Sequence, residues 1–189
     1  MSEYHEPVMG QEVLGLLSPS DDGLYLDGTA GGGGHTRMIL DACDTCRVIA
    51  VDRDPEALEE ARGALADVRA RVRFLSARFD RSVMDPEIQD RGLDGALLDL
   101  GVSSHQLDAD DRGVTFRRGA KLDMRMEGAG RDAAAFLADA DEDELMRVFR
   151  EFGEEPRARR LAREVVKRRA TEPLSTSDDL VAAMAVALG

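Results

Sequence analysis

The strongest constraint on the fold of this chain is a rhythm of short apolar runs separated by helical patterns in the first hundred residues. The runs are LYLD, RVIAVD, RVRFLS and DGALLDL, which begin at residues 24, 47, 71 and 94. The helical patterns between them cover 36–42, 54–68 and 85–91. Strands that alternate with helices form a parallel sheet covered by helices. The sequence therefore predicts an α/β fold with four parallel strands.

The composition and periodicity of the sequence change after the fourth apolar run. Residues 101–131 are polar, rich in glycine and arginine and without a clear period, which is typical of a long functional loop or of disorder. The remaining pattern is helical, with candidate helices over 132–140, 141–153, 155–169 and 175–189. Ser175 or Thr176 is expected to cap the last helix, and Gly153 to end the second. We predict a Rossmann-like core over 1–112, then a loop and small helical domain over 113–189.

Length and charge narrow the class of protein. A chain of 189 residues suffices for one core with a small appendage. It has no run of 18 apolar residues and no signal-peptide pattern at its start, so we expect a soluble cytoplasmic protein without a membrane segment. The net charge of -13 argues against a protein that coats nucleic acid through its overall field. A basic face on an acidic body is still compatible with such binding.

The two cysteines, Cys43 and Cys46, form a single C-x-x-C pattern. Such a pattern suits a redox pair or half of a zinc site. No second pair supports zinc, and this pattern closes a helix before RVIAVD, whereas a thioredoxin-like motif opens a helix after a strand. We therefore expect two buried or half-buried thiols at a helix end, and no metal site.

Four consecutive glycines, Gly31–Gly34, follow the first predicted strand and precede a helical pattern. A tight glycine turn brings backbone N–H groups close to a ligand. The dinucleotide pattern G-x-G-x-x-G does not fit, because its last position, counted from Gly31, falls on Thr36. An acid followed by a glycine-rich turn fits better, with Asp27 facing an ammonium group and the turn accommodating a small zwitterion.

Two further acids end predicted strands. Asp52 ends RVIAVD, where an acid commonly accepts hydrogen bonds from ribose hydroxyls, and Asp99 lies in DGALLDL, at the sheet edge where ligands bind. One such acid alone is more often a helix cap or a solvated strand end. Three acids at strand ends beside a glycine turn favour a ligand that is a nucleoside with an amino-acid tail. S-adenosylmethionine fits this description.

Several segments carry a resemblance to a known family. They are DGTAGGGGHTRMIL, VDRDPEAL, DGALLDLGVSSHQLD, DRGVTF, LDMRM and FGEEPRARRLAREVV. In this order they resemble the bacterial 16S ribosomal RNA cytosine N4-methyltransferases of the RsmH or MraW family. The resemblance implies S-adenosylmethionine-dependent methylation of a cytidine in the decoding centre, with 16S rRNA in the small ribosomal subunit as partner.

The resemblance also implies site residues. The family's cofactor contacts fall on Gly33, Gly34, His35, Asp52, Phe79, Asp99 and Gln106. Phe79 would lie against the adenine, although an aromatic here is otherwise more often part of the core. Asp99 is also the positional candidate for a catalytic carboxylate that accepts an N–H bond from the target amine.

Two departures from the family bear on activity. His105 stands where the family usually has proline, which leaves Gln106 less firmly placed. The family's chains also continue beyond the equivalent of Gly189 with further sheet strands. The alternative is therefore a catalytically impaired fragment or homologue that binds S-adenosylmethionine or RNA. An exposed sheet edge would also favour a homodimer.

Basic side chains form two groups in the second region. The first comprises Arg112, Arg117, Arg118, Lys121 and Arg125, and the second comprises Arg157, Arg159, Arg160, Arg163, Lys167, Arg168 and Arg169. Arg159, Arg163 and Lys167 share a helix face through their four-residue spacing, which suits contacts with phosphates. The competing interpretation is a solvated helix whose cations pair with Glu154, Glu155 and Glu164.

Overall fold

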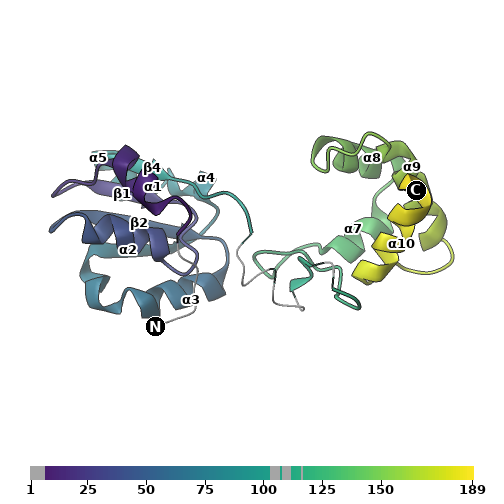
Figure 1. Cartoon of the computed structure of the whole chain (residues 1–189), viewed down its shortest axis with the longest axis horizontal. Helices are drawn as coiled ribbons and strands as arrows, with labels where there is room; N and C mark the ends of the chain where they lie inside the picture. Colours follow the sequence, from purple (N-terminus) through teal and green to yellow (C-terminus); the bar gives the residue numbers. More distant parts are fainter. Residues whose placement is uncertain (1–6, 103–106, 108–111, 116) are drawn as a thin grey trace. The chain divides into compact units, whose positions relative to one another are not determined.

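The computed structural model describes residues 7–102, 107, 112–115 and 117–189. Two compact units make up the chain, Met1–Gly101 and Val102–Gly189, which we call the α/β unit and the helical unit (Figure 1). The sequence places the change of region later, after residue 112. The roles assigned to the two regions stay predictions.

The α/β unit is built on one sheet in which all neighbouring strands are parallel. Its strands are β1 (Leu24–Asp27), β2 (Arg47–Asp52), β3 (Val72–Ser76) and β4 (Gly95–Leu97). Their order in the sheet is β3-β2-β1-β4. Each strand lies within one of the four apolar runs, so the predicted α/β, Rossmann-like class is confirmed.

The helices between these strands follow the predicted pattern with local differences. They are α1 (Gly10–Leu17), α2 (Gly34–Asp41), α3 (Pro55–Ala64), the 3-10 helix η1 (Ala66–Arg71), α4 (Phe79–Ser82) and α5 (Pro86–Arg91). The helix expected over 54–68 changes to 3-10 geometry after Leu65, a fully buried side chain of the core. The sequence did not predict α1 or α4, because α1 has no fully buried residue and α4 is a single turn.

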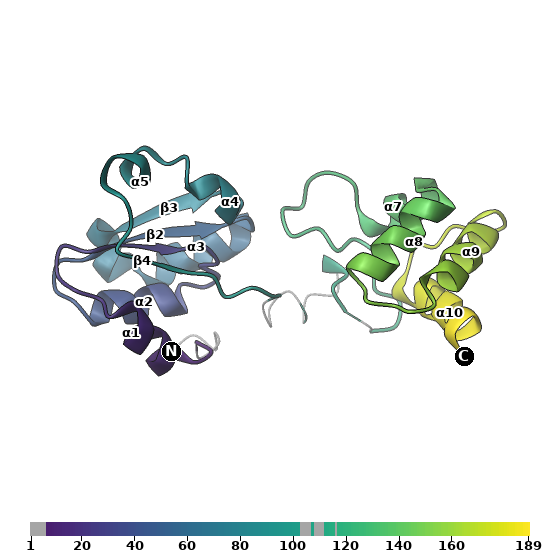
Figure 2. The same ribbon diagram turned by 90° about the horizontal axis from the view of Figure 1, so that it is seen from above.

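Helices cover both faces of the sheet (Figure 2). On one face, α1, α2 and α3 pack against a core that contains Tyr25, Val48 and Phe74. On the other face, Leu26, Ile49 and their neighbours pack with Ile88 of α5. Buried strands with both faces covered lose the alternation of apolar and polar residues, which explains the continuous apolar runs of β1 and β2.

The helical unit contains α7 (Ala133–Asp139), α8 (Glu142–Glu151), α9 (Ala158–Arg169) and α10 (Ser177–Leu188). Leucine and alanine side chains from all four helices form its core. Thr176 caps α10 as expected, and its N–H and hydroxyl both donate to Asp179. Helix α8 ends before Gly153, and the left-handed residue that follows is Glu154.

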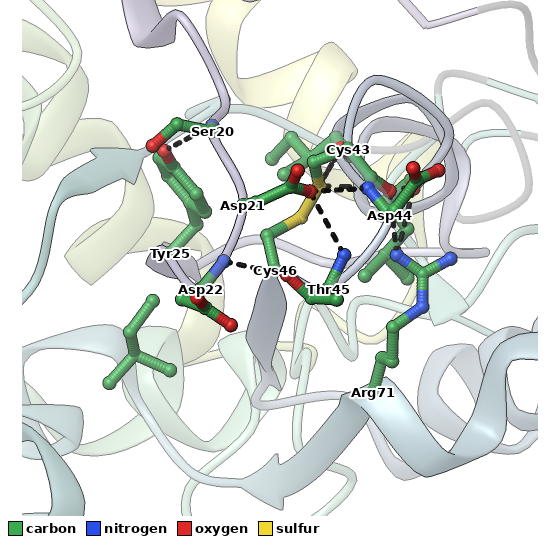
Figure 3. Close-up of a disulfide and its surroundings, with 12 residues drawn as sticks. Ser20, Asp21, Asp22, Tyr25, Cys43, Asp44, Thr45, Cys46 and Arg71 are labelled. Carbon is green, nitrogen blue, oxygen red and sulfur yellow. Dashed lines mark hydrogen bonds between the residues drawn. A yellow bond between two sulfur atoms is a disulfide. The ribbon is translucent and has the colours of Figure 1, made fainter.

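Cys43 and Cys46 form a disulfide in the connection between α2 and β2 (Figure 3). The expected pair of thiols is therefore wrong, although Cys46 is fully buried and Cys43 is half-buried, as expected. Around the disulfide, Asp21 accepts the N–H groups of Asp44 and Thr45, at 2.7 and 3.1 Å. The bond thus closes a turn that a neighbouring carboxylate also holds.

Within the described part of the chain, every helix is too short or too polar to cross a membrane.

Candidate functional site

The order of the strands creates one position in the sheet that suits a ligand. Strand β1 is central, and the chain leaves it toward β2 on one side while β4 lies on its other side. Open parallel sheets bind ligands in the crevice at such a switch point, beyond the carboxyl ends of the strands. The residues that surround this point are those of the glycine turn, the end of β2 and the segment after β4.

The glycine turn joins β1 to α2. Gly31 and Gly33 have left-handed φ angles of 51° and 88°, a conformation that glycine adopts without strain. A Cβ atom at Gly33 would also lie 3.0 Å from Cδ1 of Leu65 and 3.3 Å from Cβ of Ala61. Gly33 therefore serves both the turn and the packing of α2 against α3, while Gly31 has open space around it.

Asp27, which the sequence placed opposite an ammonium group, is instead fully buried at 0% exposure. Its Oδ2 accepts the hydroxyl of Thr36 at 2.6 Å, and its Oδ1 accepts the N–H of Thr29 at 3.3 Å. Burial raises the pKa of the Asp27 carboxyl, and the bond from Thr36 opposes that rise. The interpretation that Asp27 faces an ammonium group is wrong, because this carboxylate is inaccessible and instead accepts hydrogen bonds from the turn and from α2.

Asp52 ties the end of β2 to the glycine turn. One carboxylate oxygen accepts the N–H of Gly31 and the other accepts the N–H of Asp54, both at 2.9 Å. Each carboxylate oxygen has two lone pairs, so both retain capacity for another donor. The side chain is half-buried, and it is therefore fixed in direction and still reachable.

Asp99 and His35 lie close together across the switch point. His35 is nearly buried, and its Nδ1 lies 3.9 Å from Oδ2 of Asp99. Its Nε2 lies 3.0 Å from the carbonyl oxygen of Val8, so a proton on Nε2 leaves Nδ1 directed at Asp99. The Asp99 side chain is 52% exposed, and its backbone N–H donates to the hydroxyl of Thr29 at 2.7 Å.

Phe79 begins α4, after the third strand. It is 39% exposed, so the interpretation as a core aromatic is wrong. A Cβ atom at Gly28 would lie 3.1 Å from Cβ of Phe79, which places the root of this side chain beside the end of β1. Gln106 and His105 lie outside the described residues.

The structure thus brings the glycine turn, His35, Asp52, Asp99 and Phe79 to one end of the sheet. It adds two hydroxyls that the sequence analysis did not select, Thr29 and Thr36. Their signal was present in DGTAGGGGHT, where each threonine lies beside the glycine turn. Within the described ranges, no group of three or more His, Cys, Asp and Glu side chains is arranged to hold a metal ion.

The basic groups of the helical unit are partly neutralised. Arg125 pairs with Asp123 at 2.6 Å, Arg163 with Glu142 at 3.0 Å, and Arg168 with Glu164 at 2.7 Å. Arg169 donates to the last carbonyl groups of α7 and its cap. Exposed cations for which the described residues provide no ion-pair partner are Arg118, Lys121, Arg159 and Arg160. The ion-pair interpretation therefore holds for part of the basic groups, and contact with phosphates stays a prediction.

Comparison with known proteins gives a consistent match. The family model described as the MraW methylase family matches residues 2–188. The ribosomal RNA small subunit methyltransferase H of Granulibacter bethesdensis is 46% identical over 179 residues, which cover 93% of this chain and 53% of that protein. The protein of the same name from Thermotoga neapolitana is 43% identical over 190 residues, 99% of this chain and 62% of that protein.

The chain therefore spans about half the length of the curated relatives it matches. A solved rRNA methylase from Streptococcus thermophilus is 19% identical, with a TM-score of 0.35 over 44% of this chain and 49% of that one. This structural likeness is too weak to carry an argument.

Proposed function

Since this chain belongs to the MraW methylase family, we propose that it takes part in methylating N4 of a cytidine in the decoding centre of 16S rRNA. The proposed methyl donor is S-adenosylmethionine, and the proposed partner is the small ribosomal subunit in the cytoplasm. The observation that carries the proposal is the group of residues at the β1–β4 switch point, which combines a glycine turn, the reachable carboxylates of Asp52 and Asp99, and the partly exposed ring of Phe79.

The residues of the crevice fit such a cofactor. When bound, it supplies a methyl group on a positively charged sulfur. We assign Gly33, Gly34 and His35 to its methionine end, because Gly31 beside them has no side chain within 4 Å of its Cβ position. Asp52 would accept ribose hydroxyls with its remaining lone pairs, and Phe79 would cover the adenine. Gln106 stays a proposed contact by resemblance alone.

The target amine poses a chemical problem that Asp99 could solve. The lone pair of a cytosine amine is conjugated with the ring and is a poor nucleophile. A carboxylate that accepts one N–H bond favours tetrahedral geometry at nitrogen, and a fixed approach supplies much of the remaining rate. The exposed carboxylate of Asp99 can reach a ligand without rearrangement.

The Asp99→Asn variant separates two uses of this carboxylate. If Asp99 accepts the amine hydrogen, methyl transfer falls by roughly a hundredfold while the affinity for S-adenosylmethionine stays the same. If Asp99 contacts the cofactor instead, both quantities fall together. Retained methyl transfer with unchanged affinity would refute an essential carboxylate.

The helical unit is the proposed contact with RNA. A base must leave its stack to enter such a crevice, so the protein has to hold the surrounding backbone. The exposed cations Arg118, Lys121, Arg159 and Arg160 can contact phosphates without breaking an ion pair within the described structure. Local positive charge of this kind is compatible with a net charge of -13.

A second candidate function is binding of S-adenosylmethionine or RNA without methyl transfer. It draws on the same residues at the switch point and the same exposed cations, which binding alone also requires. Homodimerisation is a further proposal, supported by the outer edge of β4, for which the described residues supply no pairing strand.

One experiment separates the two candidates. The purified chain is incubated with S-adenosylmethionine carrying a labelled methyl group and with 30S subunits or their assembly intermediates. Label recovered in N4-methylcytidine supports the methyltransferase, whereas cofactor binding without label in RNA supports the binding module. A chain that neither binds the cofactor nor transfers the methyl group would refute both candidates.

A further inference from the structure

We propose that Thr29 is a positioning residue, which fixes Asp99 relative to the glycine turn. The inference rests on the proposed function, because it concerns the same crevice. It assigns a role to a hydroxyl that neither the sequence pattern nor the chemistry described above has used.

The first observation is the way in which pairing between β1 and β4 ends. The N–H of Gly28 donates to the carbonyl oxygen of Leu97 at 2.9 Å, as a backbone bond between neighbouring strands. One step later the N–H of Asp99 donates to the side-chain oxygen of Thr29, at 2.7 Å. The chain segments beyond β1 and β4 diverge at a switch point. The Thr29 hydroxyl therefore continues the hydrogen bonding between the two segments at the point where their backbones separate.

The backbone of Thr29 is itself fixed by a hydrogen bond to Asp27. Its N–H donates to Oδ1 of Asp27, and Oδ2 of Asp27 accepts the hydroxyl of Thr36 in the first turn of α2. Asp27 is fully buried, so this anchor is shielded from water. Three consecutive bonds thus connect α2 to the backbone of Asp99.

The side chain of Asp99 is less constrained than its backbone. Its side chain is 52% exposed, and Nδ1 of His35 lies 3.9 Å from its Oδ2. An acid that binds a ligand needs a fixed backbone and an accessible carboxylate, because the carboxylate is then positioned before the ligand arrives. Thr29, which follows β1, fixes the Asp99 backbone through its hydroxyl.

The chain contains a matched control for this bond. The hydroxyl of Thr45 also accepts a backbone N–H, that of Asp22, at 2.9 Å. It lies beside the disulfide, at the amino ends of β1 and β2, away from the crevice (Figure 3). Thr29→Val and Thr45→Val each remove one such bond, and Thr29→Ser keeps the hydroxyl.

The first measurement is the affinity for S-adenosylmethionine, by titration calorimetry on the purified chain. We expect Thr29→Val to weaken binding by roughly fivefold to tenfold, and Thr29→Ser and Thr45→Val to change it by less than about twofold. If valine at position 29 strongly lowers the unfolding temperature, Thr29→Ala replaces it. Equal affinity of the wild type and the variants without a hydroxyl at position 29 would overturn the proposal, as would failure of serine to restore binding.

The second measurement does not depend on the cofactor. Hydrogen exchange of the Asp99 amide, followed by NMR, should accelerate roughly fivefold in Thr29→Val and stay unchanged in Thr29→Ser and Thr45→Val. A wild-type chain that fails to bind S-adenosylmethionine would refute the proposed cofactor. Unchanged exchange at Asp99 in Thr29→Val would refute the role of Thr29, whatever the cofactor result.

Discussion

The two units of this protein differ in how many polar side chains they bury. In the α/β unit, fully buried polar residues such as Asp27, Thr36 and Asp54 hold turns and helix starts. In the helical unit the core is built from leucine, alanine and valine, and charged residues pair on its surface. Buried polar bonds fix the direction of a ligand site in advance, whereas surface charges stay available for a flexible partner.

This difference predicts where substitutions have their effect. Removing a buried polar partner in the α/β unit should cost about as much as truncating the core of the helical unit. Removing a surface ion pair in the helical unit should cost little stability. The predictions below run from the largest expected effect to the smallest.

Leu145→Ala should have the largest effect. Leu145 of α8 is fully buried in the helical core, and truncation of such a leucine costs about 4 kcal/mol of unfolding free energy. Peptide-resolved hydrogen exchange should rise in α8 and α9 and stay constant in β1 and β2. Phe152→Ala is the control, since Phe152 is 74% exposed. A comparable rise in both units would break the comparison.

Thr36→Val should cost about 3 kcal/mol of unfolding free energy, because it leaves the buried Asp27 carboxylate without its shortest bond. The loss should depend on pH. Burial raises the pKa of Asp27, Thr36 opposes this, and removing Thr36 therefore raises that pKa further. The folded variant then holds its proton to higher pH than the folded wild type does. Its stability deficit relative to the wild type therefore grows once the pH passes the wild-type pKa of Asp27, which lies above the ordinary value of 3.8.

Urea unfolding at about pH 4 and about pH 8 tests this dependence on Thr36. Thr36→Ser serves as the control, since it keeps the hydroxyl and should lose little stability at either pH. A deficit of equal size at both pH values would show that Asp27 is not the cause.

Reduction of the disulfide should cost about 2 kcal/mol, a small value because the Cys43–Cys46 loop is short. The carbonyl oxygen of Ile39 lies 3.2 and 3.7 Å from the two sulfurs and can accept both thiols after reduction. Urea unfolding of the α/β unit is compared with and without dithiothreitol. The doubly substituted Cys43→Ser, Cys46→Ser chain should not respond to the reductant. A response in the helical unit alone would contradict the assignment.

Arg163→Ala should have the smallest effect on stability, about 0.5 kcal/mol or less, because its pair with Glu142 is solvent-exposed and screened. Because Arg163 lies one turn from Arg159 on the same face of α9, binding of the chain to 30S subunits should weaken, and the dependence of binding on salt should become shallower. The control is Arg147→Ala, which removes a similar exposed pair with Glu151 on α8. Equal weakening by both variants would argue against a specific contact at α9.

Much of the fold could be predicted from the sequence because its signals are local. The runs that contain β1 and β2 are buried on both faces, and Asp54 followed by Pro55 marks the start of α3 as expected. The single turn of α4 and the half-buried α1 have no periodic signal of this kind. Their positions depend on the sheet against which they pack.

The candidate site was predictable in its members and less so in their roles. The glycine turn, Asp52 and Asp99 follow apolar runs, so their place at the carboxyl edge follows from parallel strands. The role of Asp27 does not, because two acids at strand ends look alike in sequence. Asp27 is fully buried, and the first turn of α2 places Thr36 where its hydroxyl donates to this carboxylate.

The sequence by itself determined a parallel α/β core, a helical region and a set of polar residues at the strand ends. Periodicity, helix caps and glycine conformations are local properties, and they can be read residue by residue. Only the tertiary structure decided that Asp27 is buried, that Cys43 and Cys46 pair, and that Thr29 meets Asp99. Thr29 and Asp99 lie 70 residues apart, and the strand order brings them together. The burial of Asp27 and the pairing of Cys43 with Cys46 depend on how α2 and β2 pack against the end of β1, which local periodicity does not report.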